Sequence, residues 1–169
     1  MRKNRKAPFS DAVQREMPRR LLDSAIAYYR AGARCSEEPD LGSPGPVNNA
    51  FSVELYLKLL ILLTKGKTER GHDLHKELYR KLPRDVRDRL LPAWTAVNWP
   101  SCETEETLIE KIRNAAKVFE QWRYSFEHEF LALFPDDLRK FARTLHALVK
   151  EFAPSDLLVP DTPEEPNRS

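Results

Sequence analysis

The sequence has few of the residues that hold small secreted or metal-binding domains together. It contains 2 cysteines among 169 residues, Cys35 and Cys102, and neither belongs to a paired metal-binding motif. A disulfide framework is therefore not expected, and we expect the protein to be in a reducing compartment. The 5 glycines and 13 prolines are too sparse for a fibrous or low-complexity chain.

The sequence also lacks an excess of one charge and a long apolar run. The 28 basic and 26 acidic residues leave a formal net charge of +2. This is not typical of a dedicated nucleic-acid binder, so any contact with RNA is expected to be local. The apolar stretch 55–63 is interrupted by Lys58 and falls short of the ~20 residues that span a bilayer. No apolar segment follows the charged N-terminus, so a signal peptide is not indicated. We expect a cytoplasmic protein without a membrane partner.

Apolar residues at helical spacing run through most of the chain. They predict helices over about residues 10–31, 49–65, 72–82, 84–97, 105–131 and 136–152. Gly32 and Gly66 are the expected stops, and Pro18 and Pro92 the expected bends. The helix over 49–65 is apolar nearly all round and should be the most buried. The expected fold is all-α, an antiparallel bundle of five to six helices.

The composition divides the chain into one domain and two tails. The helical domain is expected over residues 9–153, after a basic flexible N-terminus at 1–8. A disordered acidic tail is expected over 154–169, where Pro, Asp, Glu and Ser predominate. Within the domain, the turn-forming residues of 32–47 predict a long loop.

Two charged residues stand out in the apolar helix over 49–65. Glu54 and Lys58 are the only charges between Asn49 and Thr64, and they lie four apart on one face. Two interpretations stay open. One is an ordinary ion pair on a solvent-facing seam, which would contribute little. The other is a polar stripe that lines a cleft.

A second group of polar residues lies in the segment WRYSFEH of the helix over 105–131. Arg123 sits at the edge of the apolar stripe, and Glu127 is one turn further on. A partly buried arginine needs an acidic partner, for which Glu127 and Glu54 are candidates. In a regular helix His128 lies opposite the core and does not share a face with Arg123.

The segment GHDL places two histidines and one carboxylate close together. His72 and His75 lie three apart, with Asp73 beside them. One interpretation is that His72 caps a helix, Asp73 stabilises its first turn and His75 faces solvent, which accounts for all three. A metal site would need further ligands at suitable spacing, and the sequence offers none.

The runs NNAFSVELYLKLLILL, GHDLHKELYRKL and FEQWRYSFEHEF together resemble a bacterial branch of the HEPN domain family over about residues 48–134. The resemblance implies a helical bundle that forms a homodimer and needs no cofactor. Many members are metal-independent endoribonucleases that act as toxins or defence effectors, and others are noncatalytic partners. Catalytic members carry an arginine followed four to six residues later by a histidine. Arg123 and His128 fit the short form of that motif.

Two hypotheses follow from the resemblance. In the first, the protein is a ribonuclease in which Arg123 holds the scissile phosphate and His128 transfers a proton. Glu54, Lys58 and His72 would line its cleft. In the second, it is a noncatalytic module that binds a nucleotide, RNA or a partner protein such as an antitoxin. The cluster of Glu54, Lys58, Arg123 and Glu127 would then hold the bundle or the dimer together.

Overall fold

The computed structural model describes residues 11–37, 44–98, 104–123, 135–161 and 163. All elements in these ranges are helical, which confirms the predicted all-α bundle. They are α1 (Asp11–Glu37), α2 (Pro44–Lys65), the π turn η2 (Leu74–Leu78), the 3-10 turn η3 (Tyr79–Lys81), α3 (Arg84–Asn98), α4 (Glu105–Arg123) and α5 (Pro135–Phe152).

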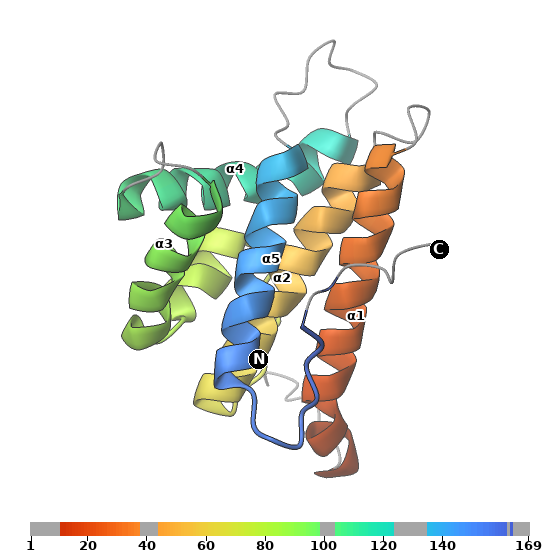
Figure 1. The fold of residues 1–169 in the computed structure, drawn as a ribbon, viewed down its shortest axis with the longest axis vertical. Coiled ribbons are helices and arrows are strands. Elements are labelled where there is room, and N and C mark those ends of the chain that lie inside the picture. Colours follow the sequence, from red (N-terminus) through yellow and green to blue (C-terminus); the bar gives the residue numbers. More distant parts are fainter. Residues whose placement is uncertain (1–10, 38–43, 99–103, 124–134, 162, 164–169) are drawn as a thin grey trace, which may run out of the picture.

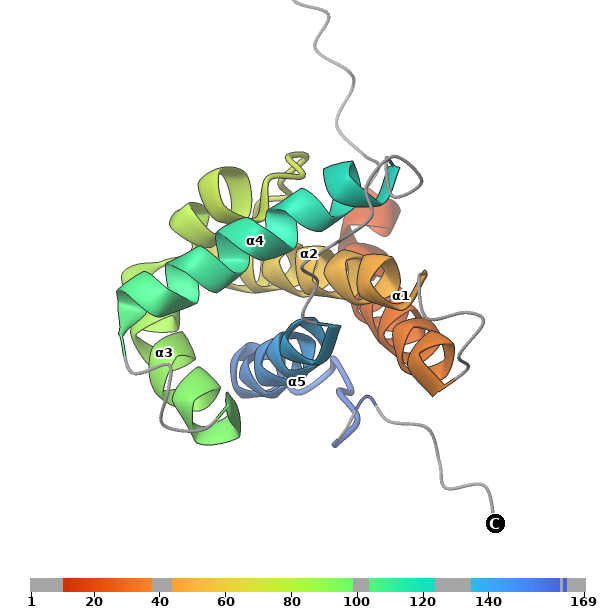
Figure 2. The ribbon, with the colours of Figure 1, turned by 90° about the horizontal axis from the view of Figure 1, so that it is seen from above.

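Three long helices form the body of the bundle. Figure 1 shows α1, α2 and α5 side by side, with α1 and α2 running in opposite directions. Helix α4 crosses over one end of α2, and η2 lies beside it (Figure 2). Helix α3 packs against α5. This arrangement brings two segments that are distant in the sequence, the GHDL region and α4, next to each other.

Helix α2 is the centre of the core, as its apolar sequence predicts. Most of its residues are buried, including Val53, Leu57, Leu60 and Ile61, which have no solvent exposure. By length and composition it is also, among the described residues, the one helix that could cross a membrane. More than half of that apolar window, 56%, is buried inside the bundle. Burial in a protein core therefore accounts for its composition.

Helix α1 passes through Gly32, where the sequence predicts a stop, and continues to Glu37. The reason lies in packing. A Cβ atom at position 32 would lie 2.2 Å from Oδ1 of Asn49, a fully buried residue of α2. Glycine is present because α2 approaches closely there, and it does not end the helix. Helix α2 also begins earlier than predicted, at Pro44, because proline is well suited to a first helical turn.

Other boundaries agree with the prediction. Gly66 ends α2 with a φ of 63°, and its N–H donates to the Leu62 carbonyl at 2.8 Å. Thr104 caps α4 through a 3.3 Å hydrogen bond from the Thr107 N–H.

Two expectations differ from the structure. Pro92 lies inside α3 and does not break it. The region predicted as a helix over 72–82 is instead one π turn followed by one 3-10 turn.

Residues 154–161, part of the segment for which the sequence predicts disorder, run back between α5 and α1 (Figure 1). Leu157 and Val159 pack against the core. The Pro160 carbonyl lies 2.8 Å from Nε2 of the buried His146. The packing of Leu157 and Val159, together with the hydrogen bond to the buried His146, gives this part of the tail a defined position.

Candidate functional site

A groove of about 780 Å³ runs between the GHDL region and α4, and we call it the η2–α4 groove. Its walls carry several ionisable side chains. One wall belongs to residues 72–80 and the other to α4. The lining residues are His72, Asp73, His75, Lys76, Arg80, Glu110, Arg113, Asn114, Ala116 and Lys117.

Four cations of this groove lack an ionic partner. Among the described residues, Lys76, Arg80, Arg113 and Lys117 form no ion pair within 4 Å, although Asp73 and Glu110 also line the groove. Neighbouring cations outside the groove are paired: Lys81 binds Glu69, and Lys111 binds Asp137. Unpaired cations on two facing walls produce a local positive field that an anionic ligand would neutralise.

His75 lies at the bottom of the groove wall. Only 7% of the residue is exposed, and its ring stacks on Tyr79 with centroids 6.2 Å apart. Burial, and then the positive charge of Arg113, lower the pKa of His75. The ring is therefore neutral near neutral pH and offers one donor and one acceptor nitrogen. The expectation that His75 faces solvent is wrong, because Leu74 and Leu78 anchor this turn in the core.

The GHDL segment is held by a reciprocal set of caps. Asp73 Oδ1 accepts from the N–H groups of His75 at 3.0 Å and Lys76 at 2.8 Å. Glu77 Oε2 reaches back to the N–H groups of His72 at 2.9 Å and Asp73 at 3.2 Å. These two N–H groups lower the pKa of Glu77. The sequence assigns the cap to His72 and only a first-turn role to Asp73, and this is wrong, because the Asp73 carboxylate is the group that caps the turn. The return bond from Glu77 makes the turn a variant of the capping box.

Gly71 is required by this arrangement. A Cβ atom at position 71 would lie 2.3 Å from Oε2 of Glu77 and 2.6 Å from its Cβ atom. Any larger residue would displace the carboxylate that holds the main chain of His72. Each position of GHDL therefore has a physical role, with Leu74 fully buried beneath the turn.

Glu54, Lys58 and His72 come together at one edge of the groove. Oε1 of Glu54 lies 2.7 Å from Nζ of Lys58 and 3.0 Å from Nδ1 of His72. The Glu54 and Lys58 side chains are only 5% and 13% exposed, whereas that of His72 is 77% exposed. The pair is therefore mostly buried and does not form a solvent-facing seam. Oε2 of Glu54 is buried and accepts no hydrogen bond within the described part of the chain.

Of the other predicted site residues, the structure describes only the main chain of Arg123. Arg123 is the last residue of α4, and its side chain is not among those described. Glu127 and His128 lie outside the described residues, so their predicted roles stay predictions. The partnership of Arg123 with Glu54 or Glu127 likewise stays a prediction.

The sequence interpretation missed the cations of α4 and of the η2–η3 turns. A signal was present, because Arg113 and Lys117 are like charges four apart in a helix, as are Lys76 and Arg80. Like charges at this spacing repel each other on an isolated helix. Only the tertiary structure shows that the two pairs line one groove.

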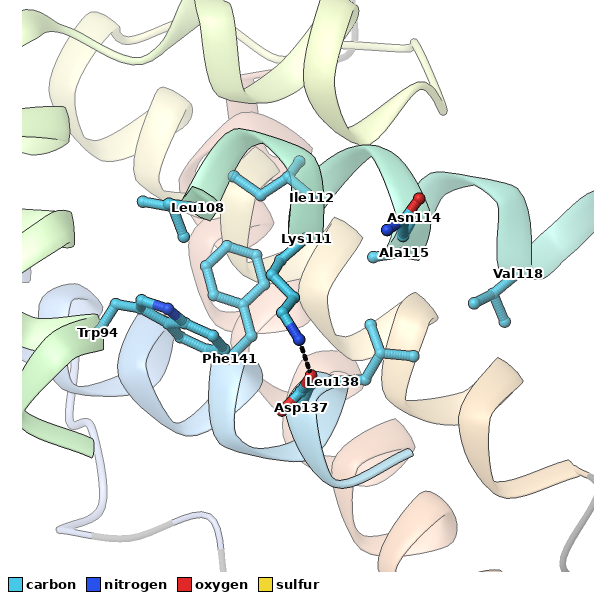
Figure 3. A pocket seen from close by; sticks show the side chains of 10 residues that line it. All are labelled: Trp94, Leu108, Lys111, Ile112, Asn114, Ala115, Val118, Asp137, Leu138 and Phe141. Atoms are coloured by element: carbon cyan, nitrogen blue, oxygen red, sulfur yellow. Dashed lines mark hydrogen bonds and ion pairs between the residues drawn. The ribbon is translucent and has the colours of Figure 1, made fainter. Parts of the chain in front are cut away.

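A second cavity lies between α3, α4 and α5 and is apolar (Figure 3). It measures about 40 Å³ and is lined mainly by core side chains such as Trp94, Leu108 and Phe141. The ion pair of Lys111 and Asp137 lies at its edge. A cavity of this size has room for about one water molecule and is too small for a nucleotide.

Comparisons with known proteins give no match. No family model, no curated protein and no solved structure resembles this chain significantly. Within the described ranges, no three His, Cys, Asp or Glu side chains gather in a way that could hold a metal ion. The chemistry of the η2–α4 groove is therefore the basis on which a function can be argued.

Proposed function

We propose that this protein is a HEPN-type RNA-binding protein that cleaves RNA without a metal ion. The observation that carries the proposal is the η2–α4 groove, whose two facing walls carry four cations that form no ion pair with any described residue. Phosphate contacts supply most of the affinity of proteins for nucleic acids, and lysine and arginine make them. Because the overall charge is only +2, any contact with RNA is expected to be local, and this groove is the site we propose for it.

The position of Arg123 in α4 supports a connection between the groove and the predicted catalytic pair. Ala116 lines the groove, and position 123 follows it by seven residues in the same helix. Seven residues are close to two turns, so the two positions share a face about 10 Å apart. This spacing suits RNA that enters the groove and extends toward position 123.

The proposed roles follow the chemistry of the side chains. The planar guanidinium of Arg123 would hold the scissile phosphate through paired hydrogen bonds. His128 would be a proton-transfer group, because an imidazole exchanges protons near neutral pH. Lys58, Glu54 and His72 would form the polar edge of the cleft, where the structure brings them together.

The proposal is tested by incubating single-stranded RNA with the protein in the presence of EDTA. Wild type, Arg123→Ala and His128→Ala are compared at equal concentration. Cleavage by wild type, and a loss of about 100-fold or more in both variants, is expected for a charge-stabilising and a proton-transfer group. Equal cleavage by all three preparations would indicate a contaminating nuclease and contradict the assignment.

A second candidate function is a noncatalytic module that binds RNA or a nucleotide. The observation that favours it is that the cations of the groove and His75 line one surface to which neither Arg123 nor His128 contributes among the described residues. Binding of RNA without cleavage by the wild type would select this candidate. The homodimer implied by the HEPN resemblance is part of both proposals and is checked by sedimentation equilibrium.

A further inference from the structure

The ring of His72 is oriented by a buried carboxylate. Its Nδ1 lies 3.0 Å from Oε1 of Glu54, and Lys58 pairs with the same oxygen at 2.7 Å. Because the ammonium of Lys58 balances the charge of Glu54, His72 need not be protonated to hold its bond. A carboxylate oxygen only accepts, so Nδ1 carries the hydrogen and Nε2 of the neutral ring keeps its lone pair. The same logic orients the histidine of carboxylate–histidine dyads in hydrolases.

The main chain of His72 is fixed as firmly as its ring. Oε2 of Glu77 accepts from the His72 N–H at 2.9 Å, and Asp73 caps the turn that follows. The absence of a side chain at Gly71 leaves room for this contact. A histidine held at both main chain and ring, with its side chain 77% exposed along the groove, is preorganised to act on a bound ligand.

We propose that His72 is the general base of the RNA cleavage proposed above, and that Glu54 is its positioning residue. The inference rests on that function. Nε2 of His72 takes the proton of a ribose 2′-hydroxyl as the 2′ oxygen forms a bond to phosphorus. The bond from phosphorus to the 5′ oxygen breaks, and this oxygen takes up a proton from the solvent. The products are a 2′,3′-cyclic phosphate and a 5′-hydroxyl.

The surroundings of His72 suit this step. From α2 it faces the Glu54–Lys58 pair, and from its own turn Asp73, Lys76, Glu77 and the buried His75. From α4 and the η3 turn the groove adds four charged groups, namely Glu110, Arg113, Lys117 and Arg80. Cations across the groove can hold the phosphate whose neighbouring 2′-hydroxyl is presented to Nε2.

The test separates orientation from proton transfer. In His72→Asn, the side-chain Nδ2 can occupy the place of Nδ1 and donate to Glu54, but nothing replaces Nε2. His72→Gln serves as a second variant. Melting temperature, affinity for an RNA with 2′-O-methyl groups, and kcat between pH 5 and 8 are measured for wild type, both variants and Glu54→Gln, with EDTA present.

We expect the His72 variants to melt and bind RNA as wild type does, while kcat falls about 100-fold or more and no longer decreases toward low pH through protonation of a general base. Glu54→Gln should lower kcat by a smaller factor with RNA affinity unchanged. Variants of His72 that cleave within about threefold of wild type, with the same pH profile, would overturn the inference and leave the proposed function standing. A wild type that binds RNA without cleaving it would overturn both the cleavage and the role of His72.

Discussion

Gly32 and Asn49 show how one residue without a side chain determines the contact of two helices. Oδ1 of Asn49 occupies the place that a Cβ atom at position 32 would take. Both polar atoms of the Asn49 amide are buried and, among the described residues, have no hydrogen-bond partner. The α1–α2 contact therefore fits closely, but within the described part of the chain it leaves the two polar atoms of the Asn49 amide without hydrogen bonds.

A substitution at Gly32 tests this contact. Alanine is favoured over glycine inside a helix by about 0.5–1 kcal/mol. Overpacking a core costs about 1–3 kcal/mol, so the contact with Asn49 should dominate. We expect Gly32→Ala to lower the free energy of unfolding by about 1–2 kcal/mol in urea titrations. Adding Asn49→Ala should recover most of this stability. Equal stability of Gly32→Ala and wild type would contradict the close approach.

His146 carries the clearest pH dependence of stability. Burial lowers its pKa, while Nε2 donates to the Pro160 carbonyl and Nδ1 lies 3.0 Å from the Tyr56 hydroxyl. A carbonyl only accepts, so Nδ1 is the unprotonated nitrogen and the Tyr56 hydroxyl donates to it. Burial also raises the pKa of Tyr56, which keeps that donor protonated. The folded state therefore holds a neutral imidazole.

Acidification should weaken the fold through this residue. The unfolded chain binds a proton at His146 near pH 6.5, where the folded chain does not. Its contribution is thus present in full above about pH 6.5 and decreases as the pH falls toward the lowered folded pKa. In urea titrations between pH 7.5 and 5, we expect His146→Gln to show a weaker loss of stability than wild type. The pKa of His75 is lowered as well, so His75 contributes to the loss of stability in the same direction. Identical pH dependence in the two proteins would contradict the assignment.

At the scale of elements, hydrophobic spacing located the long helices well and the short turns poorly. The inward residues of α5, such as Leu138, Leu145 and Leu148, are buried as their spacing predicts. At 74–81 the spacing predicts one regular helix, whereas the structure has a π turn and a 3-10 turn. Their geometry depends on the return bond of Glu77 and on packing against α2 and α4, which the local sequence does not encode.

The cap at Asp73 should control the stability of this turn. Its Oδ1 accepts two main-chain hydrogen bonds, and removing an N-cap side chain costs about 1 kcal/mol. We expect Asp73→Ala to lower stability by about that amount, measured by thermal unfolding. Asp73→Asn keeps the accepting oxygen and serves as the matched control with near wild-type stability. An equal loss of stability in both variants would show that the charge, rather than the cap, holds the turn.

At the scale of the whole molecule, the candidate site is a product of topology. Sequence reasoning identified Glu54, Lys58 and His72, which do meet at one edge of the groove. It did not identify Arg113 and Lys117, because their function depends on α4 crossing beside η2 (Figure 2). The formal net charge of +2 gives no sign of this groove, whose lining carries four cations and two carboxylates.

The proposal that RNA binds in the η2–α4 groove is tested most directly by the affinity of the protein for single-stranded RNA, measured by fluorescence anisotropy over a range of salt concentrations. Wild type is compared with Arg113→Gln/Lys117→Gln. The matched control is Arg19→Gln/Arg84→Gln, which removes two exposed cations outside the groove. We expect weaker binding by the groove variant alone, with a salt slope smaller by about 0.7 for each phosphate that the variant no longer neutralises. Equal affinity and equal slope in all three proteins would contradict the proposal that RNA binds in this groove.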